Sequence, residues 1–213
     1  MVQPASRGPG RPPAAKAAET RKRILRAARE VFSERGYDAA TFQAIAIRAD
    51  LTRPAINHYF SNKRALYREL AKETNALVVT DSVERARRET TLVHRVVAFI
   101  DATTQADVEN RTAAAFLITV ALESQRHPEL RQEEADSVRD TREFLSWAID
   151  DAIARGELAA DTDASALAET LLAVLLGIGF YAGFVAKHDF DTVIRQLQQL
   201  LADSLTRTPE PGQ

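Results

Sequence analysis

Apolar side chains recur at helical spacing along most of the chain, and this pattern limits the possible folds more than any other feature of the sequence. The first such face carries Ile24, Leu25, Ala28, Val31 and Phe32. Gly36 then follows as a stop signal. Beyond residue 80, candidate helices lie near 91–107, 112–124, 129–155, 163–186 and 189–206. Residues 20–70 hold no credible strand, so the pattern predicts an all-α protein.

The two parts of the chain carry opposite net charge. Residues 1–70 contain 14 Lys and Arg against 6 Asp and Glu, a net charge of +8, whereas residues 71–213 contain 14 against 24, a net charge of −10. Basic side chains gain free energy on binding a polyanion because they release the counterions condensed on its phosphates. We therefore expect only the amino-terminal part to bind nucleic acid, with a chance imbalance of solvated surface charge as the alternative.

The least polar segment, residues 170–186, contains no charged residue and resembles a membrane span in composition. It is shorter than the roughly 20 apolar residues that a spanning helix needs, and Gly177, Gly179 and Gly183 interrupt it. We predict a buried helix of a helical bundle and no membrane partner. The chain also has no cysteine, and its amino terminus does not resemble a secretory signal. We therefore expect a cytoplasmic protein.

Polar residues mark the starts of three further helices after the first. The Thr41 hydroxyl can cap a second helix, which ends near Asp50. Thr52 can cap a third, with Pro54 in its first turn, and Ser61 can cap a fourth. Two short helices joined by a tight turn, with polar residues projecting from the second, match the dimensions of the DNA major groove. Helical hairpins that bind no DNA share this pattern.

The run from residue 41 to residue 66, TFQAIAIRADLTRPAINHYFSNKRAL, resembles the helix-turn-helix motif of the TetR family of transcriptional regulators. In that family a Thr opens the second helix, an Ile-Ala pair packs it, and a Ser or Thr opens the recognition helix. Aromatic residues then precede a Ser/Asn-Lys pair that opens the fourth helix. Phe32, Gly36 and Tyr37 match the end of the family's first helix. The resemblance implies a three-helix DNA-binding domain joined to a larger helical ligand-binding and dimerisation domain.

Carried over residue by residue, the resemblance implies a set of DNA contacts. Thr41, Lys63 and the Tyr59 hydroxyl would contact phosphate. The residues that face the groove would be Thr52, Arg53, Pro54, Asn57 and His58. Arg53 can pair with guanine and Asn57 with adenine, while Pro54 can contact a thymine methyl group. His58 and Tyr59 have the alternative of supporting the fold.

Three residues depart from the commonest form of this motif. Pro54 and Asp50 stand where Gly is frequent, and Asn57 stands where Tyr is frequent. Asn57 therefore lacks a phosphate-binding hydroxyl and is placed to read a base instead. Asp50 has to adopt a left-handed turn conformation, which Asp tolerates better than most residues.

We divide the chain into four parts: a disordered basic arm (1–19), a helix-turn-helix domain (20–80, with the motif at 41–60), a helical ligand-binding and dimerisation domain (81–207) and a disordered tail (208–213). Within the arm, Gly10-Arg11-Pro12 is similar to the core of an AT-hook, in which an arginine enters a narrow minor groove. Arg11 is therefore a candidate DNA contact. A flexible basic tail with diffuse attraction to phosphate is the alternative.

Dimerisation and ligand binding are expected of the acidic part. Two-fold dimers read paired half-sites, and the family commonly pairs its last two helices, here about 163–206, in a four-helix bundle. Aromatic residues are frequent in the middle helices, as in many ligand pockets. The candidates are Phe99, Phe116, Phe144, Trp147, Phe180 and Tyr181. Core packing is the alternative for each of them, and the small apolar ligand itself is implied by the resemblance.

The sequence does not favour an enzyme. It has four His and no Cys, and it shows neither a Gly-rich phosphate loop nor a Ser-His-Asp set nor paired metal-ligand spacing. We therefore expect no catalytic residue, cofactor or metal. The function we predict is that of a homodimeric repressor which a small apolar ligand releases from a palindromic operator. The alternative is an apolar-ligand carrier or interaction bundle without operator function.

Overall fold

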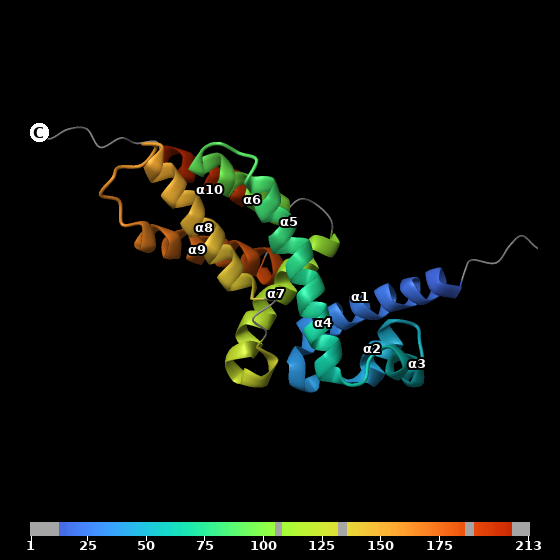
Figure 1. Cartoon of the computed structure of the whole chain (residues 1–213). Helices are drawn as coiled ribbons and strands as arrows, with labels where there is room; N and C mark the ends of the chain where they lie inside the picture. The colour runs from blue at the N-terminus through green and yellow to red at the C-terminus, as the bar shows by residue number, and fades with distance from the viewer. Residues whose placement is uncertain (1–12, 105–107, 132–135, 186–189, 206–213) are drawn as a thin grey trace, which may run out of the picture. The chain divides into compact units, whose positions relative to one another are not determined.

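The computed structural model of the chain describes residues 13–104, 108–131, 136–185 and 190–205, and within these ranges helices account for all regular structure (Figure 1). In chain order they are α1 (Pro13–Ala39), α2 (Phe42–Arg48), α3 (Arg53–Tyr59), α4 (Lys63–Asn75), η1 (Ala76–Thr80), α5 (Asp81–Ala86), α6 (Leu92–Thr104), α7 (Val108–Arg126), η2 (Pro128–Leu130), α8 (Ser137–Ala154), α9 (Ala164–Phe180), η4 (Tyr181–Val185) and α10 (Phe190–Leu205). The predicted all-α class is confirmed. Two compact units meet within α4, the first ending at Tyr67 and the second beginning at Arg68.

The first unit packs α1, α2, α3 and the start of α4 around an apolar core. Fully buried side chains in it include Ile24, Phe32, Ile45, Ile56 and Tyr67. Helices of seven residues, such as α2 and α3, are too short to be stable alone. Burial of Ile45 and Ile56 therefore holds these two helices in place.

α1 begins earlier than the sequence pattern indicated. Residues 13–19, assigned above to a disordered arm, are helical, so that prediction was wrong over this stretch. Pro13 stands at the first position, where its missing amide hydrogen costs nothing, and good helix formers follow it. Residues 1–12, with the candidate DNA contact Arg11, lie outside the described residues. Gly36, the expected stop signal, has φ 74° and interrupts the regular backbone near the end of α1.

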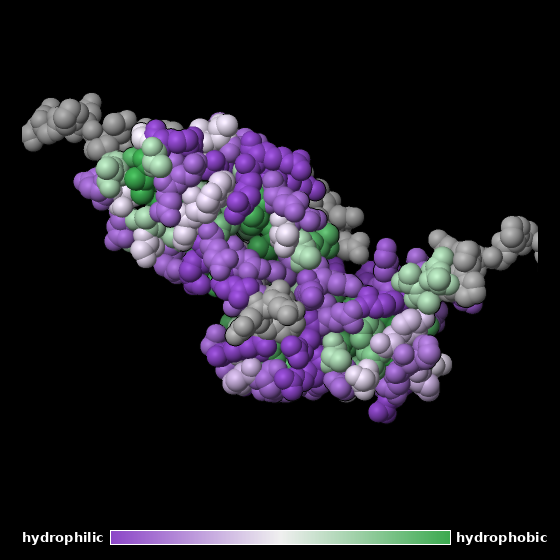
Figure 2. All heavy atoms as spheres, viewed as in Figure 1, coloured by the Kyte–Doolittle hydropathy of each residue, from purple (hydrophilic) through white to green (hydrophobic). Residues whose placement is uncertain are grey.

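The second unit has a larger core, to which all of its long helices contribute. α8 packs along α9, α7 packs against α9 and η4, and α6 packs against α5, α8 and α10. Buried side chains in this core include Val96, Leu117, Leu145, Ala148 and Leu172. Hydrophilic residues dominate the face of the chain shown in Figure 2, with hydrophobic residues visible in small groups between them. The unit therefore has the usual arrangement of an apolar interior under a polar surface.

Residues 170–185 of the apolar stretch that resembled a membrane span lie in α9 and η4. Ala164–Val185 is the one helical segment in the described ranges that is long and apolar enough to cross a membrane. Ala168, Leu171 and Leu172 within it are buried in the core of the second unit. A Cβ added to Gly183 would come within 2.8 Å of the Ala115 Cα, so η4 and α7 approach each other closely at this glycine. Only 33% of the most apolar window of this segment is buried within the chain, so the expected buried helix is only partly buried here.

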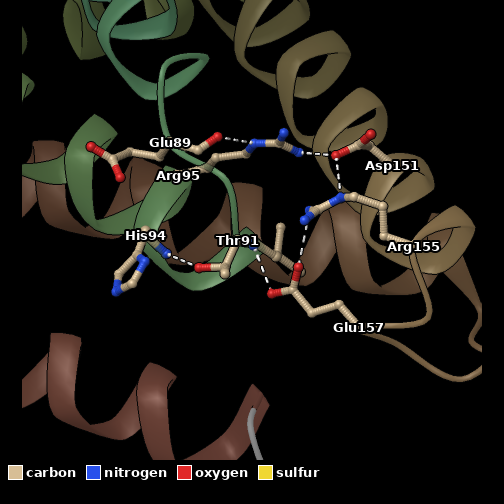
Figure 3. A network of polar contacts seen from close by, with 8 residues as sticks. Glu89, Thr91, His94, Arg95, Asp151, Arg155 and Glu157 are labelled. Carbon is tan, nitrogen blue, oxygen red and sulfur yellow. Dashed lines mark hydrogen bonds and ion pairs between the residues drawn. The ribbon is translucent and has the colours of Figure 1, made fainter.

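A polar network joins the α5–α6 connection to the end of α8 (Figure 3). Arg95 donates to the Glu89 carbonyl oxygen and to the Asp151 carboxylate. Asp151 also accepts from Arg155, whose guanidinium bonds to Glu157 at 3.0 Å. The Glu157 carboxylate in turn accepts the backbone N–H of Leu92, the first residue of α6, at 2.8 Å. The network satisfies an otherwise unpaired amide at the start of α6 and fixes this helix to α8.

Candidate DNA interface and ligand cavity

α3 presents a row of polar side chains to solvent. The Thr52 side chain accepts the backbone N–H of Ala55 at 3.3 Å and so caps the helix, and Pro54 lies in the first turn. Ile56 is the side chain of α3 that is fully buried. The five residues predicted to face the DNA groove are all exposed, namely Thr52, Arg53, Pro54, Asn57 and His58. The structure thus brings these five residues together on one short helix.

The turn between α2 and α3 is held from α1. Asp50 has φ 51°, the left-handed conformation expected at this position of the motif. Arg23 donates from its Nη2 to the carbonyl oxygens of Ala49 at 2.6 Å and of Asp50 at 3.1 Å. Sequence reasoning missed Arg23 because its partners are backbone atoms, which leave no signal in the sequence. Arg23 therefore fixes the turn that aims α3.

The expected phosphate contacts Thr41, Tyr59 and Lys63 lie in different settings. Thr41 is exposed, and its hydroxyl oxygen accepts the Ala44 N–H at 3.1 Å, which leaves the hydroxyl hydrogen to donate elsewhere. Tyr59 is half-buried, with its ring 5.3 Å from that of His58. The Lys63 ammonium donates to the carbonyl oxygen of Tyr37 at 2.7 Å. Lys63 thus has a partner inside the first unit.

A charged cluster fastens α2 to α1. Arg48 donates to Glu34 at 2.7 and 2.9 Å and to Glu30 at 2.8 Å. The hydrogen bond from Arg48 lowers the pKa of the Glu34 carboxyl below its ordinary value, and the two carboxylates raise the pKa of Arg48. Across the described ranges, no group of three or more His, Cys, Asp or Glu side chains is arranged to hold a metal ion. Because its hydrogen bonds join Arg48 of α2 to two carboxylates of α1, the cluster is a structural link between these helices.

The second unit contains a partly open apolar cavity of about 70 Å³. Its wall is mainly aliphatic and comes from η1, α6, α7, α8, α9 and η4, with Val79, Leu117 and Leu175 among the lining residues. Thr103 and Thr141 also line it, but their hydroxyls donate to carbonyl oxygens of their own helices. The cavity is small beside pockets of about 300–1,000 Å³ that hold drug-sized ligands. It can accept a short apolar group.

The six aromatic candidates for ligand binding do not share one site. Phe99 lines the cavity, and Phe144 stacks on it with ring centroids 5.4 Å apart. Trp147 lies between the guanidinium groups of Arg87 and Arg95, 4.3 and 4.4 Å from its ring. The other three are placed as follows: Phe116 is fully buried, Tyr181 stacks against Phe190 at 6.2 Å, and Phe180 is 49% exposed. The aliphatic lining carried no sequence signal because cores use the same residues.

Apolar side chains are also exposed on the last helices. Phe180 and Phe184 lie with ring centroids 5.3 Å apart near the end of α9 and in η4. Val185, Val193 and Leu200 extend this set along η4 and α10, and each is at least 40% exposed. Exposed large apolar side chains of this kind mark interaction surfaces when they are contiguous.

Two family models match the chain. Residues 24–70 match the model described as bacterial regulatory proteins, tetR family, and residues 92–207 match the model described as BetI-type transcriptional repressor, C-terminal. The first match covers α2, α3 and most of α1. The second covers the helices that expose the apolar side chains and, apart from η1, the helices that line the cavity.

Individual proteins with similar sequence or structure are transcriptional regulators. The regulator UidR of Escherichia coli K12 is 26% identical over 162 residues, which cover 75% of this chain and 79% of that protein. The structure of Salmonella enterica GusR is 28% identical, covers 87% of this chain and 96% of its own, and has a TM-score of 0.61. A regulator from Saccharomonospora viridis, solved with choline, is 21% identical over 90% of this chain and 97% of its own, with a TM-score of 0.70, and shows the shared fold.

Proposed function

Because this chain belongs to the TetR family of bacterial transcriptional regulators, we propose that it is a homodimeric repressor which leaves a palindromic operator when a small apolar ligand binds. The observation that carries the proposal is the exposed polar face of α3, a capped helix whose buried side holds Ile56. A helix of this kind fits the major groove with its side chains at the base edges. The protein would act in the cytoplasm, on DNA of the nucleoid.

We assign the recognition of the DNA bases to three residues of α3. Arg53 would donate two hydrogen bonds to a guanine, Asn57 would pair with an adenine, and Pro54 would contact a thymine methyl group. Thr52 and His58 complete the face, while Thr41, Tyr59, Lys63 and Arg11 would contact the DNA backbone or minor groove. The functional domains of the proposal are residues 20–80 for DNA and residues 81–207 for ligand and dimer.

The dimer would form through the last two helices, about 163–206. The exposed apolar side chains Phe180, Phe184, Val193 and Leu200 support this surface, because burying them in a two-fold contact removes them from water. Sedimentation at micromolar concentration should give a dimer, and Leu200→Glu should shift it towards a monomer. A monomeric wild-type protein would exclude this arrangement.

Ligand binding would weaken operator binding by favouring a different spacing of the two recognition helices. The free-energy change available is the differential affinity of the ligand for the two spacings. The apolar cavity and its neighbouring cleft in the second unit supply a place for the ligand apart from α3. Addition of a ligand that raises the melting temperature should release operator DNA in the same concentration range.

Selection of random duplex DNA on the purified protein, at about 0.15 M salt, tests operator binding because this salt concentration weakens nonspecific phosphate contacts. We expect a palindrome to be enriched. The double variant Arg53→Ala, Asn57→Ala should lose the enrichment, whereas Arg88→Ala, which removes one exposed positive charge from the second unit, should keep it. Absence of enrichment with the wild type would favour a ligand carrier without operator function. Enrichment that is unchanged in the double variant would overturn the assignment of base recognition to Arg53 and Asn57.

A reporter gene placed behind the selected operator gives the sign of regulation. Repression predicts that deleting the gene for this protein raises reporter expression and that ligand does the same. A fall in expression on deletion would instead identify an activator, with the DNA-binding role unchanged.

A further inference from the structure

A polar cleft lies beside the apolar cavity in the second unit. Its volume is about 530 Å³, within the range of ligand pockets. The cleft is lined mainly by α7, η2 and the start of α8. Among the described residues, those that line it with a charged side chain are Arg131, Arg139, Arg142 and Asp136. The charges on its wall therefore favour an anion.

The cleft and the apolar cavity adjoin each other at shared lining residues. Ala121, Ser137 and Val138 line both of them. One side of this junction is aliphatic, with Leu117 and Leu176 in the cavity wall, and the other carries the arginines. A molecule lying across the junction would have one end against apolar side chains and the other end among guanidinium groups.

The hydrogen bonds that hold Arg131 and Arg142 at the cleft leave N–H donors of both guanidinium groups available to a ligand. Arg131 donates from its Nε to the Ser124 carbonyl oxygen at 3.1 Å, which fixes the base of its guanidinium. Arg142 donates from its Nε to Glu169 at 2.6 Å, but both side chains of this pair are about half exposed. Exposed ion pairs contribute little free energy, and a guanidinium has five N–H donors. An incoming anion can therefore join or displace Glu169.

The carboxylate of the cleft, Asp136, has a structural role. Asp136 accepts the backbone N–H of Arg139 at 3.0 Å and so caps α8. Arg139 lies 3.2 Å from Asp140 and 3.7 Å from Glu143, so it is the most neutralised of the three arginines. Arg131 and Arg142 are consequently the groups best placed to bind a ligand.

We propose that the cavity and the cleft form one binding site for an amphiphilic anion, with a short apolar group in the cavity and an anionic group at Arg131 and Arg142. The proposal rests on the proposed function, in which the second unit binds a small molecule, and it specifies the chemical class of that molecule. The small volume of the cavity limits the apolar part to a few carbon atoms beyond the junction.

Calorimetric titration of the full-length protein, without DNA, tests the chemical class. The probes are hexanoate, 1-hexanol and hexyltrimethylammonium, which share the alkyl chain and differ in charge. We expect hexanoate to bind at least tenfold more tightly than either of the other two, because the anion alone can form an ion pair with bidentate hydrogen bonds to arginine. Equal or weaker binding of hexanoate, or no binding of any probe, would overturn the proposal.

Variants locate the anionic end. Arg131→Gln and Arg142→Gln should each weaken hexanoate binding about tenfold and leave hexanol binding unchanged, and Arg88→Gln, exposed and outside the cleft, should change neither. Glu169→Gln should tighten hexanoate binding because it removes the competing carboxylate. Loss of affinity for both hexanoate and hexanol in the arginine variants would indicate a merely structural role and overturn the assignment.

The two experiments distinguish a failure of the proposed regulatory function from a failure of the proposed anion site. Operator selection is carried out without ligand, and the titration is carried out without DNA. A protein that enriches a palindrome but does not prefer hexanoate retains the proposed regulatory function and loses the anion site. A protein that prefers hexanoate but enriches no DNA retains the site and loses the operator role.

Discussion

The ammonium of Lys63 lies 2.7 Å from the carbonyl oxygen of Tyr37 and 4.3 Å from the centroid of the Tyr37 ring. A second hydrogen bond reaches the Asp38 carbonyl oxygen at 3.1 Å. Two of the three N–H donors of Lys63 therefore bind the end of α1, and one remains for phosphate. Because Lys63 is the first residue of α4, its side chain joins the end of one helix to the start of another.

Lys63→Met keeps the aliphatic stem of this side chain and removes the ammonium. We expect the free energy of unfolding, measured in urea, to fall by about 1–2 kcal/mol because hydrogen bonds to a charged donor are lost. Arg64→Met, at the exposed neighbouring position, should change it much less. An unchanged free energy of unfolding in Lys63→Met would contradict this role. If Lys63 also contacts phosphate, the salt dependence of operator binding should fall by about one phosphate contact.

Helix positions could be predicted from the sequence where a cap and a periodic face agree. Thr41 and Thr52 each accept the backbone N–H three residues later, as their side-chain chemistry predicted. The predicted cap at Ser61 was wrong, because the side chain of the next residue, Asn62, accepts the Ala65 N–H at 2.8 Å and so caps α4. The start of α1 could not be placed correctly, because the Ala-rich stretch 14–19 is exposed and carries no apolar period.

The sites were less predictable than the helices. The exposed face of α3 could be inferred because it follows from a short motif with fixed spacing. The cavity wall could not, because Val79, Leu117 and Leu175 look like any other core residues, while the aromatic residues that drew notice mostly pack elsewhere. Arg23 and Lys63 donate to backbone carbonyl oxygens, and such partners depend on the tertiary fold alone.

Gly183 tests the close approach of η4 and α7. In Gly183→Ala the new Cβ would collide with Ala115, including its backbone Cα. Rotation of a side chain therefore cannot relieve the collision. We expect a loss of about 1–3 kcal/mol in the free energy of unfolding, as for overpacked cores. Gly177→Ala is the matched control, since nothing of the chain lies within 4 Å of its added Cβ. The control should be as stable as the wild type or more stable, because alanine favours helix.

The polar network around Asp151 predicts a pH dependence of stability. The hydrogen bond from Arg95 holds the pKa of the Asp151 carboxyl below its ordinary value of 3.8. A lowered pKa in the folded state means that the stabilisation is fully present above about pH 3.8 and is lost as the pH falls through the lowered pKa. Asp151→Asn should therefore melt at a lower temperature than the wild type at pH 7. The difference between the two melting temperatures should narrow below about pH 3.8.

Asp150→Asn is the control for this effect, because Asp150 is exposed and adjacent. Its melting temperature should follow that of the wild type at every pH. A difference between Asp151→Asn and the wild type that stays constant from pH 7 to pH 3 would show that the loss comes from packing and not from the ionised carboxylate.

Phe99 and Trp147 separate ligand binding from stability. Phe99 lines the cavity, whereas the Trp147 ring lies between the guanidinium groups of Arg87 and Arg95. Phe99→Leu should weaken hexanoate binding several-fold, because apolar contact with the ligand is reduced. Trp147→Phe should leave that affinity unchanged and lower the free energy of unfolding by about 1 kcal/mol, since Trp is the strongest partner for a cation. Reduced hexanoate affinity in Trp147→Phe at unchanged stability would place Trp147 in the binding site and would contradict the separation drawn from the cavity wall.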